Sequence, residues 1–315
     1  MKSWQIVFEW EDILSDILKQ PLTYNTDFNV GFYIIGKKLK ISSGFQLVDA
    51  LSKPDKYSLY FEMTAKDHFT HSSKHNIIPV IVDFFFKREE LPLFYQAFRN
   101  CKLILISSLE VYDFLVENKC PLNIRHFALS ISDIYKLTED STFDKKYDVV
   151  LPGRPSKVMF DFLKQYEKTH PGIEYIYRTD DKNAMTYASN KNGVIGEFES
   201  REDYVSLLRS GRISFYTTPG IDGGEKRTNG FNPVTPRFLE LLAAGCMVMG
   251  RYPRNSDTEF YELDQLCHNI DSYTKFETVL DNLLQQKTYP KESYIKFLNK
   301  HYTSARANLL ISILK

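Results

Sequence analysis

Short apolar runs rich in Val, Ile, Phe and Tyr alternate with amphipathic stretches of helical length along most of the 315-residue chain. Such runs are typical of strands buried on both faces, and the stretches between them are long enough for crossover helices. The alternation therefore predicts an α/β fold built from βα units around mostly parallel sheets. In the first half we expect strands at residues 5–10, 30–35, 58–63, 77–85, 103–108 and 124–130.

A polar segment at residues 136–146, KLTEDSTFDKK, interrupts this rhythm, and its charged and hydroxyl residues are typical of a linker. After it the pattern restarts, with strands expected near 147–151, 173–178, 192–198, 212–218 and 246–252, and helices near 156–169, 201–210 and 235–245. We therefore predict two α/β domains in tandem, at residues 1–140 and 146–290, followed by closing helices at 291–315.

The composition narrows the classes of partner. Lys plus Arg number 40 and Asp plus Glu number 40, so no summed positive field draws nucleic acid, and we expect no nucleic-acid partner. The 4 cysteines are far apart, without the close pairing of a zinc site or a secreted disulfide framework. The amino terminus has no long uncharged run, so we expect a soluble, cytoplasmic protein and leave peripheral contact with the inner face of a membrane open.

The segment LPGRPSK, residues 151–157, joins a predicted strand end to a predicted helix start through Gly153. Free backbone N–H groups at such a turn bind anions well. Arg154 and Lys157 add two cations at the helix entrance. Taken alone, the segment is equally compatible with an anion site and with solvated surface charges.

A second informative segment is the predicted helix at 235–245, TPRFLELLAAG. Its small residues before and at Gly245 allow close approach to a neighbouring backbone, and Arg237 and Glu240 lie on one helical face. An ion pair between these two side chains is the alternative to a ligand-binding role. The preceding loop, GIDGGEKRTNG at 220–230, is suited either to closing on a ligand or to an exposed connection.

RFLELLAAGCMVMG, at residues 237–250, resembles the signature of GT-B glycosyltransferases, in the group that includes the family 4 retaining enzymes and capsule or O-antigen transferases of bacterial surface polysaccharide biosynthesis. YDVVLPGR and the following Lys157 are similar to the opening strand and phosphate loop of the family's C-terminal domain. Residues 192–219 are similar to its nucleobase-side strand, helix and next strand. The resemblance covers about residues 77–265.

This resemblance implies two Rossmann-like domains with mostly parallel sheets that face each other across a cleft, the C-terminal one holding the donor. The implied donor-site residues are Gly153, Arg154, Lys157, Phe198, Asn232, Arg237 and Glu240. In the family, the glutamate at the position of Glu240 holds the donor ribose and cations after the first strand hold the diphosphate. Arg154, Lys157 and Glu240 are therefore the expected catalytic residues, whereas Asn232 stands where many members carry an acidic residue.

The implied activity is transfer of a sugar from a nucleoside diphosphate donor to a carbohydrate or lipid-linked acceptor, and the family group favours retention of configuration. No D-x-D triplet occurs, so we expect no metal and no cofactor beyond the nucleotide-sugar co-substrate. Cations aimed at the leaving diphosphate take the place of a metal ion.

An inverting enzyme would need a general base on the acceptor side, and His71, His75 or Asp83 would suit that role. The histidine-rich stretch HFTHSSKH, residues 68–75, is also compatible with a zinc site or with a solvated cluster. Two other functions stay open: a GT-B-fold UDP-sugar epimerase and a non-catalytic donor-binding subunit of a polysaccharide assembly complex.

Overall fold

The computed structural model describes residues 5–20, 58–65, 77–153, 156–179, 185–198, 200–224 and 226–314. The chain forms two compact units. The larger unit comprises Met1–Ile17, Ser130–Glu225 and Asn232–Lys315, and the smaller comprises Leu18–Leu129 and Lys226–Phe231. The chain therefore passes from one unit to the other several times.

The described part of the smaller unit is built on a four-stranded parallel sheet in the order β1-β2-β3-β4. Its elements are β1 Ser58–Thr64, β2 Ile77–Asp83, η3 Arg88–Glu90, α4 Leu91–Phe98, β3 Ile104–Ile106, α5 Leu109–Glu117, β4 Ile124–His126 and η6 Lys226–Thr228. The strands predicted at 58–63, 77–85, 103–108 and 124–130 are thus confirmed, although the last one ends at His126. The strand predicted at 30–35 lies outside the described residues.

An aromatic cluster forms part of the core of the smaller unit. Phe84 meets Phe94 edge-on, with ring centroids 5.2 Å apart. Phe231 also meets Phe84 and Phe114 edge-on, at 6.0 Å and 5.1 Å. Edge-to-face pairs of this kind are favourable beyond the area they bury. They explain why the short segment Lys226–Phe231 folds with this unit although its sequence neighbours do not.

The larger unit contains a seven-stranded sheet in the order β11-β10-β9-β5-β6-β7-β8. The strands are β5 Tyr147–Leu151, β6 Tyr175–Arg178, β7 Thr186–Ser189, β8 Gly193–Glu197, β9 Gly211–Thr217, β10 Met247–Arg251 and β11 Cys267–Asn269. Five of the strands pair in parallel, and β7 and β8 extend the sheet antiparallel at one edge. A short turn joins β7 to β8, and Gly193 supplies the positive φ of +69° at its end.

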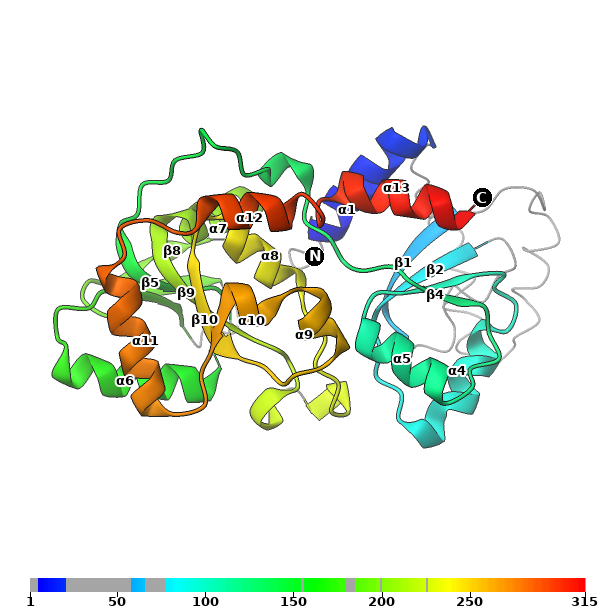
Figure 1. Cartoon of the computed structure of the whole chain (residues 1–315), viewed down its shortest axis with the longest axis horizontal. Helices are drawn as coiled ribbons and strands as arrows, with labels where there is room; N and C mark the ends of the chain where they lie inside the picture. Colours follow the sequence, from blue (N-terminus) through cyan, green and yellow to red (C-terminus); the bar gives the residue numbers. More distant parts are fainter. Residues whose placement is uncertain are drawn as a thin grey trace. The chain divides into compact units, whose positions relative to one another are not determined.

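Helices cover both faces of this larger sheet (Figure 1). The helices described in the larger unit are α1 Gln5–Leu18, η4 Asp133–Tyr135, α6 Lys157–Thr169, α7 Arg201–Ser210, η5 Ile221–Gly223, α8 Pro236–Ala243, α9 Ser256–Phe260, α10 Leu263–Leu266, α11 Tyr273–Gln285, α12 Lys291–Leu298 and α13 Thr303–Leu314. Helices α6 and α11 lie together on one face, and α7, α8 and α12 lie on the other. The core under α6 and α11 is fully apolar, with Met159, Leu163, Phe276 and Leu280 packed on strand residues such as Val149 and Ile213.

The prediction of a strand at residues 5–10 was wrong, because this segment begins helix α1. Its buried residues, Val7, Trp10 and Leu14, are spaced by three and four positions and form one face of the helix. The indole N–H of Trp10 donates to the carbonyl oxygen of Ser130, at 3.0 Å. The β-favouring residues of QIVFEW are therefore overridden by a helical spacing that shows only over the full element.

The units divide the chain differently from the predicted domains. The polar segment at 136–146 has neither helix nor strand, but it lies inside the larger unit, and the main division falls between Leu129 and Ser130. Helix α1 folds with the larger unit up to Ile17, as do the closing helices α12 and α13. The amino-terminal helix is thus a structural part of the unit formed mainly by the second half of the chain.

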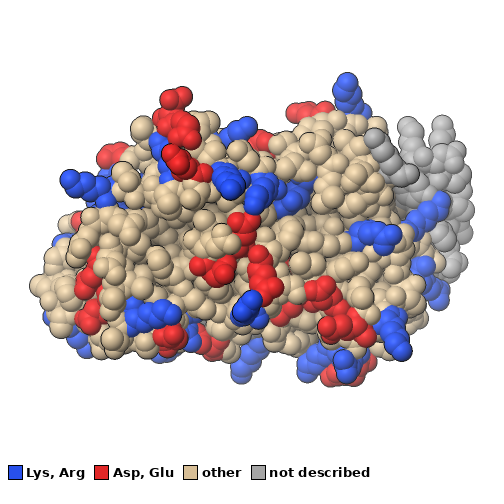
Figure 2. Space-filling view, viewed as in Figure 1, with Lys and Arg blue, Asp and Glu red and all other residues tan. Residues whose placement is uncertain are grey.

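Charges of both signs are mixed on the face of the molecule that Figure 2 shows. Figure 2 shows acidic and basic side chains interspersed on the visible face, with no broad basic area among the described residues drawn there. Such a face provides no extended positive surface for a nucleic-acid backbone.

We predict that Trp10→Ala lowers the free energy of unfolding by about 3–5 kcal/mol, because it removes a buried aromatic side chain and leaves a cavity. Phe8→Ala is the matched control: Phe8 lies on the same helix but is 53% exposed, so its loss changes stability by at most about 0.5 kcal/mol. Urea denaturation of both variants measures the difference. Equal losses would contradict the assignment of Trp10 to the buried face.

Candidate functional site

The larger sheet has a topological switch point at β5. From β5 the chain moves to β6 on one side, and β9 pairs with β5 on the other. In open α/β sheets, ligands bind beyond the carboxyl ends of strands at such a point. Gly153, two residues after the end of β5, lies there with φ of +64°. Its N–H donates to the hydroxyl oxygen of the buried Tyr187, at 3.0 Å.

Arg237 lies directly against the Gly153 turn. A Cβ atom at Gly153 would stand 2.6 Å from Nη2 of Arg237, so the positive φ favours glycine here and a larger residue would displace the end of the Arg237 side chain. Arg237 occupies the first turn of α8, which starts at Pro236. Burial lowers the pKa of Arg237, but the oxygens of Tyr204 and Glu240 outweigh it and raise the pKa, so the guanidinium stays charged.

Glu240, one turn further along α8, has a side chain only 8% exposed. Its Oε1 forms an ion pair with Nη2 of Arg201, at 2.6 Å, and its Oε2 accepts a hydrogen bond from the hydroxyl of Tyr204, at 3.2 Å. Among the described residues no ion pair joins Arg237 to Glu240, so the intrahelical pair weighed as an alternative is not formed. Glu240 is held instead by two residues of α7.

Arg201 is itself held by a second carboxylate. Its Nε forms an ion pair with Oε1 of Glu9 in helix α1, at 3.1 Å, and its guanidinium stacks over the ring of Tyr135, at 5.2 Å. The Tyr135 hydroxyl donates to the same Glu9 oxygen, at 2.5 Å. Burial lowers the pKa of Arg201, and Glu240 and Glu9 together more than reverse that effect. The Arg201 charge is therefore fixed between two carboxylates.

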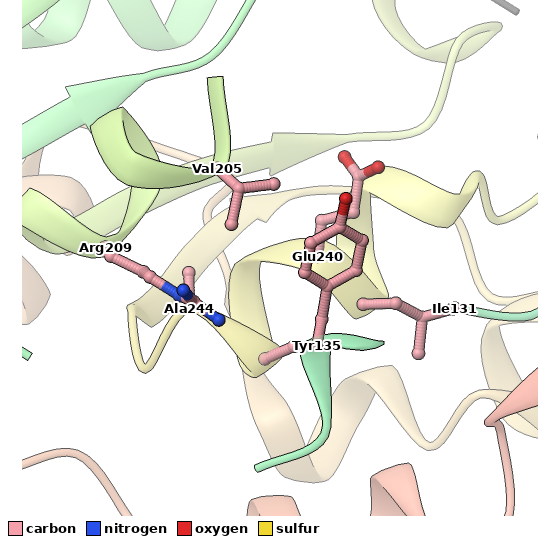
Figure 3. Close-up of a pocket in the computed structure, with 7 residues that line it drawn as sticks. Ile131, Tyr135, Val205, Arg209, Glu240 and Ala244 are labelled. Carbon is pink, nitrogen blue, oxygen red and sulfur yellow. The ribbon is translucent and has the colours of Figure 1, made fainter. Parts of the chain in front are cut away.

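A small pocket lies beside this network. It is lined by Ile131, Tyr135, Val205, Arg209, Glu240, Ala243 and Ala244. Figure 3 shows the Tyr135 hydroxyl and the Glu240 carboxylate on the same side of the pocket, with the Arg209 guanidinium on the other. The small side chains of Ala243 and Ala244, at the end of α8, form part of the wall of this hollow.

The structure places the other predicted donor residues at different distances from this centre. Phe198 meets Tyr187 edge-on, at 5.5 Å, so it lies one ring away from the Gly153 turn. Lys157, at the start of α6, is 89% exposed and pairs with Asp161, at 2.7 Å. Arg154 lies outside the described residues.

Asn232 is buried and holds the backbone before α8. Its Oδ1 accepts a hydrogen bond from the Thr218 hydroxyl, at 2.9 Å, and its carbonyl oxygen accepts one from the Asn255 amide, at 3.2 Å. The side chain thus connects the end of β9 to the segment that enters α8. This contact accounts for an asparagine here without a ligand.

Asp83, one of the residues predicted as an acceptor-side base, is the last residue of β2 in the smaller unit, and its backbone carbonyl accepts from the Ala65 N–H, at 3.2 Å. His71 and His75 lie outside the described residues. No group of three or more His, Cys, Asp or Glu side chains in the described part of the chain is arranged to hold a metal ion. None of the helices described is both long and apolar enough to cross a membrane.

Sequence reasoning did not identify Glu9, Tyr135, Tyr187, Arg201 or Tyr204 as site residues. One signal existed: Arg201 directly follows the Ser200 N-cap, at the helix end where the macrodipole disfavours a cation. An arginine at that position indicates a fixed negative partner elsewhere in the fold. The partners themselves come from segments that no local pattern connects.

No protein-family model and no curated protein matches the sequence. Among solved structures, sucrose-phosphate synthase from Thermosynechococcus elongatus is similar, with a TM-score of 0.58, 11% identity, and coverage of 93% of this chain and 80% of that one. The N-terminal domain of Candida albicans trehalose-6-phosphate phosphatase gives a TM-score of 0.54, 10% identity and coverage of 97% and 80%.

The pneumococcal O-GlcNAc transferase GtfA, solved with UDP and GlcNAc, gives a TM-score of 0.47 at 11% identity, covering 76% of this chain and 52% of that one. The chain thus spans about half the length of GtfA. Together with the parallel sheet of the smaller unit and the mostly parallel sheet of the larger one, the likeness to sucrose-phosphate synthase shows the fold: the chain has the α/β, GT-B architecture of two Rossmann-like units, as predicted.

We predict that Gly153→Ala and Gly193→Ala each lose about 1–2 kcal/mol of stability, because both glycines have positive φ and alanine is strained there. Only Gly153→Ala also displaces the Arg237 guanidinium, since nothing lies within 4 Å of the Cβ position at Gly193. NMR detection of the Arg237 Nε–H resonance should show a large shift in Gly153→Ala alone. An unchanged resonance in Gly153→Ala would contradict the contact.

Proposed function

We propose that this protein is a glycosyltransferase that moves a sugar from a nucleoside diphosphate donor to a carbohydrate or lipid-linked acceptor on the cytoplasmic side of a membrane or in the cytoplasm. The GT-B fold supports the proposal, because its neighbours include sucrose-phosphate synthase and other glycosyltransferases. The observation that carries it is local: the Arg237 guanidinium lies on the Gly153 turn, one helical turn from the buried carboxylate of Glu240. A cation at a glycine turn suits the diphosphate of such a donor, and a nearby carboxylate that can accept hydrogen bonds suits its ribose hydroxyls.

Each group then has a chemical task. Glu240 accepts hydrogen bonds from the ribose hydroxyls, and the Gly153 turn with Arg237 receives the diphosphate. Lys157 adds charge at the start of α6, whose N-terminal end favours anions, and we assign the same task to Arg154, three positions before it in the sequence. Phe198 lies on the nucleobase side.

In the reaction the acceptor hydroxyl oxygen forms a bond to the anomeric carbon and the bond between that carbon and the diphosphate breaks. The electron pair of the broken bond stays on the leaving phosphate oxygen, and the acceptor proton passes to that oxygen or to a protein base. Positive groups already aimed at that oxygen stabilise the charge as it develops. With Arg154, Lys157 and Arg237 in this role, we propose a reaction that needs neither a metal ion nor a further cofactor. Retention of configuration needs no protein base, whereas inversion would assign that role to Asp83, His71 or His75.

The proposal is tested first by a thermal-shift screen with UDP, GDP, ADP and CMP, each with and without magnesium. A ligand that binds only the folded protein raises its apparent stability. We expect one diphosphate to raise the melting temperature, without a requirement for magnesium. No shift with any nucleotide would contradict the proposal.

We predict that Glu240→Gln and Arg237→Met each weaken binding of that diphosphate by about 10–100-fold, the effect of losing one charge-assisted hydrogen bond. Glu259→Gln is the matched control, because it also breaks a carboxylate–arginine pair, but an exposed one with Arg254. Isothermal titration calorimetry measures the affinities. Wild-type affinity in both site variants would show that the donor binds elsewhere.

Turnover separates the transferase from its alternatives. Incubation with UDP-glucose, UDP-N-acetylglucosamine or GDP-mannose and an oligosaccharide or polyprenyl-phosphate-sugar acceptor should release nucleoside diphosphate only when the acceptor is present. Conversion of the donor sugar without acceptor would identify an epimerase. Donor binding without turnover across acceptors would identify a donor-binding subunit.

A further inference from the structure

Three helices meet at one buried chain of charges in the larger unit. Glu9 of α1, Arg201 of α7 and Glu240 of α8 follow one another, with Arg201 contacting a carboxylate on each side, at 3.1 Å and 2.6 Å. All three side chains are at most 16% exposed. Burying charges is costly unless each is paired, so these side chains constrain one another's positions.

The stability of α7 does not explain an arginine at position 201. The helix is capped by Ser200, whose hydroxyl oxygen accepts from the Asp203 N–H, at 3.0 Å. Glu202 and Asp203 already suit the positive end of the helix dipole, whereas Arg201 opposes it. Its position is explained by what it holds, namely the Glu240 carboxylate.

The contacts at Glu240 leave part of its hydrogen-bond acceptor capacity unused. A carboxylate accepts about four hydrogen bonds through its two oxygens. Tyr204 donates a hydrogen bond to Oε2, whereas Arg201 contacts Oε1 as an ion pair without hydrogen-bond geometry at its Nη2. These two contacts fix the plane of the carboxylate and leave one further site on each oxygen, which matches two adjacent hydroxyl groups.

We propose that Glu9 and Arg201 are positioning residues for nucleotide ribose recognition: they orient Glu240 so that its free lone pairs receive the ribose hydroxyls. This inference rests on the proposed function. Glu9 keeps Arg201 shared between two carboxylates, and Tyr135 fixes Glu9 through the 2.5 Å hydrogen bond. Without the charge of Glu9, Arg201 turns wholly to Glu240 and occupies the lone pairs that the ribose needs.

The amino-terminal helix therefore contributes to donor recognition, although Glu9 and Glu240 are far apart in sequence and Glu9 needs no contact with the nucleotide. Its effect is specific to the ribose hydroxyls. A merely structural role for Glu9 would weaken every nucleotide equally.

The experiment compares UDP, GDP or ADP, whichever the wild type binds, with its 2′-deoxy and 3′-deoxy forms by isothermal titration calorimetry. We expect wild type to prefer the ribose form by about 10-fold or more, from one lost hydrogen bond to a charged acceptor. In Glu9→Gln this preference should fall to within about 3-fold, while affinity for the deoxy forms stays within about 3-fold of wild type. Glu259→Gln, at an exposed ion pair, should keep the full preference.

Tyr135→Phe provides a second, milder variant, because it keeps the Glu9 charge and removes only one of its hydrogen bonds. It should reduce the ribose preference in the same direction by a smaller factor, and it decides the question if Glu9→Gln does not fold by circular dichroism. An unchanged preference in these variants, or an equal loss for ribose and deoxyribose forms, overturns the positioning role. Failure of the wild type to bind any of the three diphosphates refutes the proposed function itself, and the inference with it.

Discussion

The ion pair between Arg201 and Glu240 is the interaction on which the candidate site depends. It buries two opposite charges between α7 and α8, and Glu9 extends it to α1. Removing one partner of a buried ion pair leaves the other charge uncompensated. The free energy lost in this way is larger than the net free energy that forming the pair contributes to stability. The network therefore contributes more to the position of these helices than to net stability, and it fixes the Glu240 carboxylate between Arg201 and Tyr204.

Much of the fold was predictable because strands buried on both faces are read directly as apolar runs. The strand before Gly153 and the helix that carries Glu240 were found in this way. The strand prediction for residues 5–10 was wrong, because these six residues are rich in β-favouring types. The helical spacing of the buried residues becomes visible only over the full length of α1. The short β7 and β11 were not predicted, since three or four residues carry little periodicity.

The residues of the candidate site likewise fall into two groups, those that belong to a local sequence pattern and those that only tertiary packing brings to the site. Gly153 and Glu240 belong to local patterns, a glycine after a strand and a carboxylate in a helix that ends in small residues, so the sequence alone indicates them. Glu9 and Arg201 reach the site only through tertiary packing, and no pattern along the chain joins them. Apolar patterning specifies the architecture, whereas function depends on a few side chains placed upon it.

The most direct test of this account is a crystal structure of the protein with the nucleoside diphosphate that stabilises it. The account predicts the diphosphate at the Gly153 turn beside Arg237, and the ribose hydroxyls within hydrogen-bond distance of Glu240 while Arg201 still pairs with that carboxylate. A nucleotide bound away from the carboxyl end of β5, or a ribose that displaces Arg201 from Glu240, would contradict it.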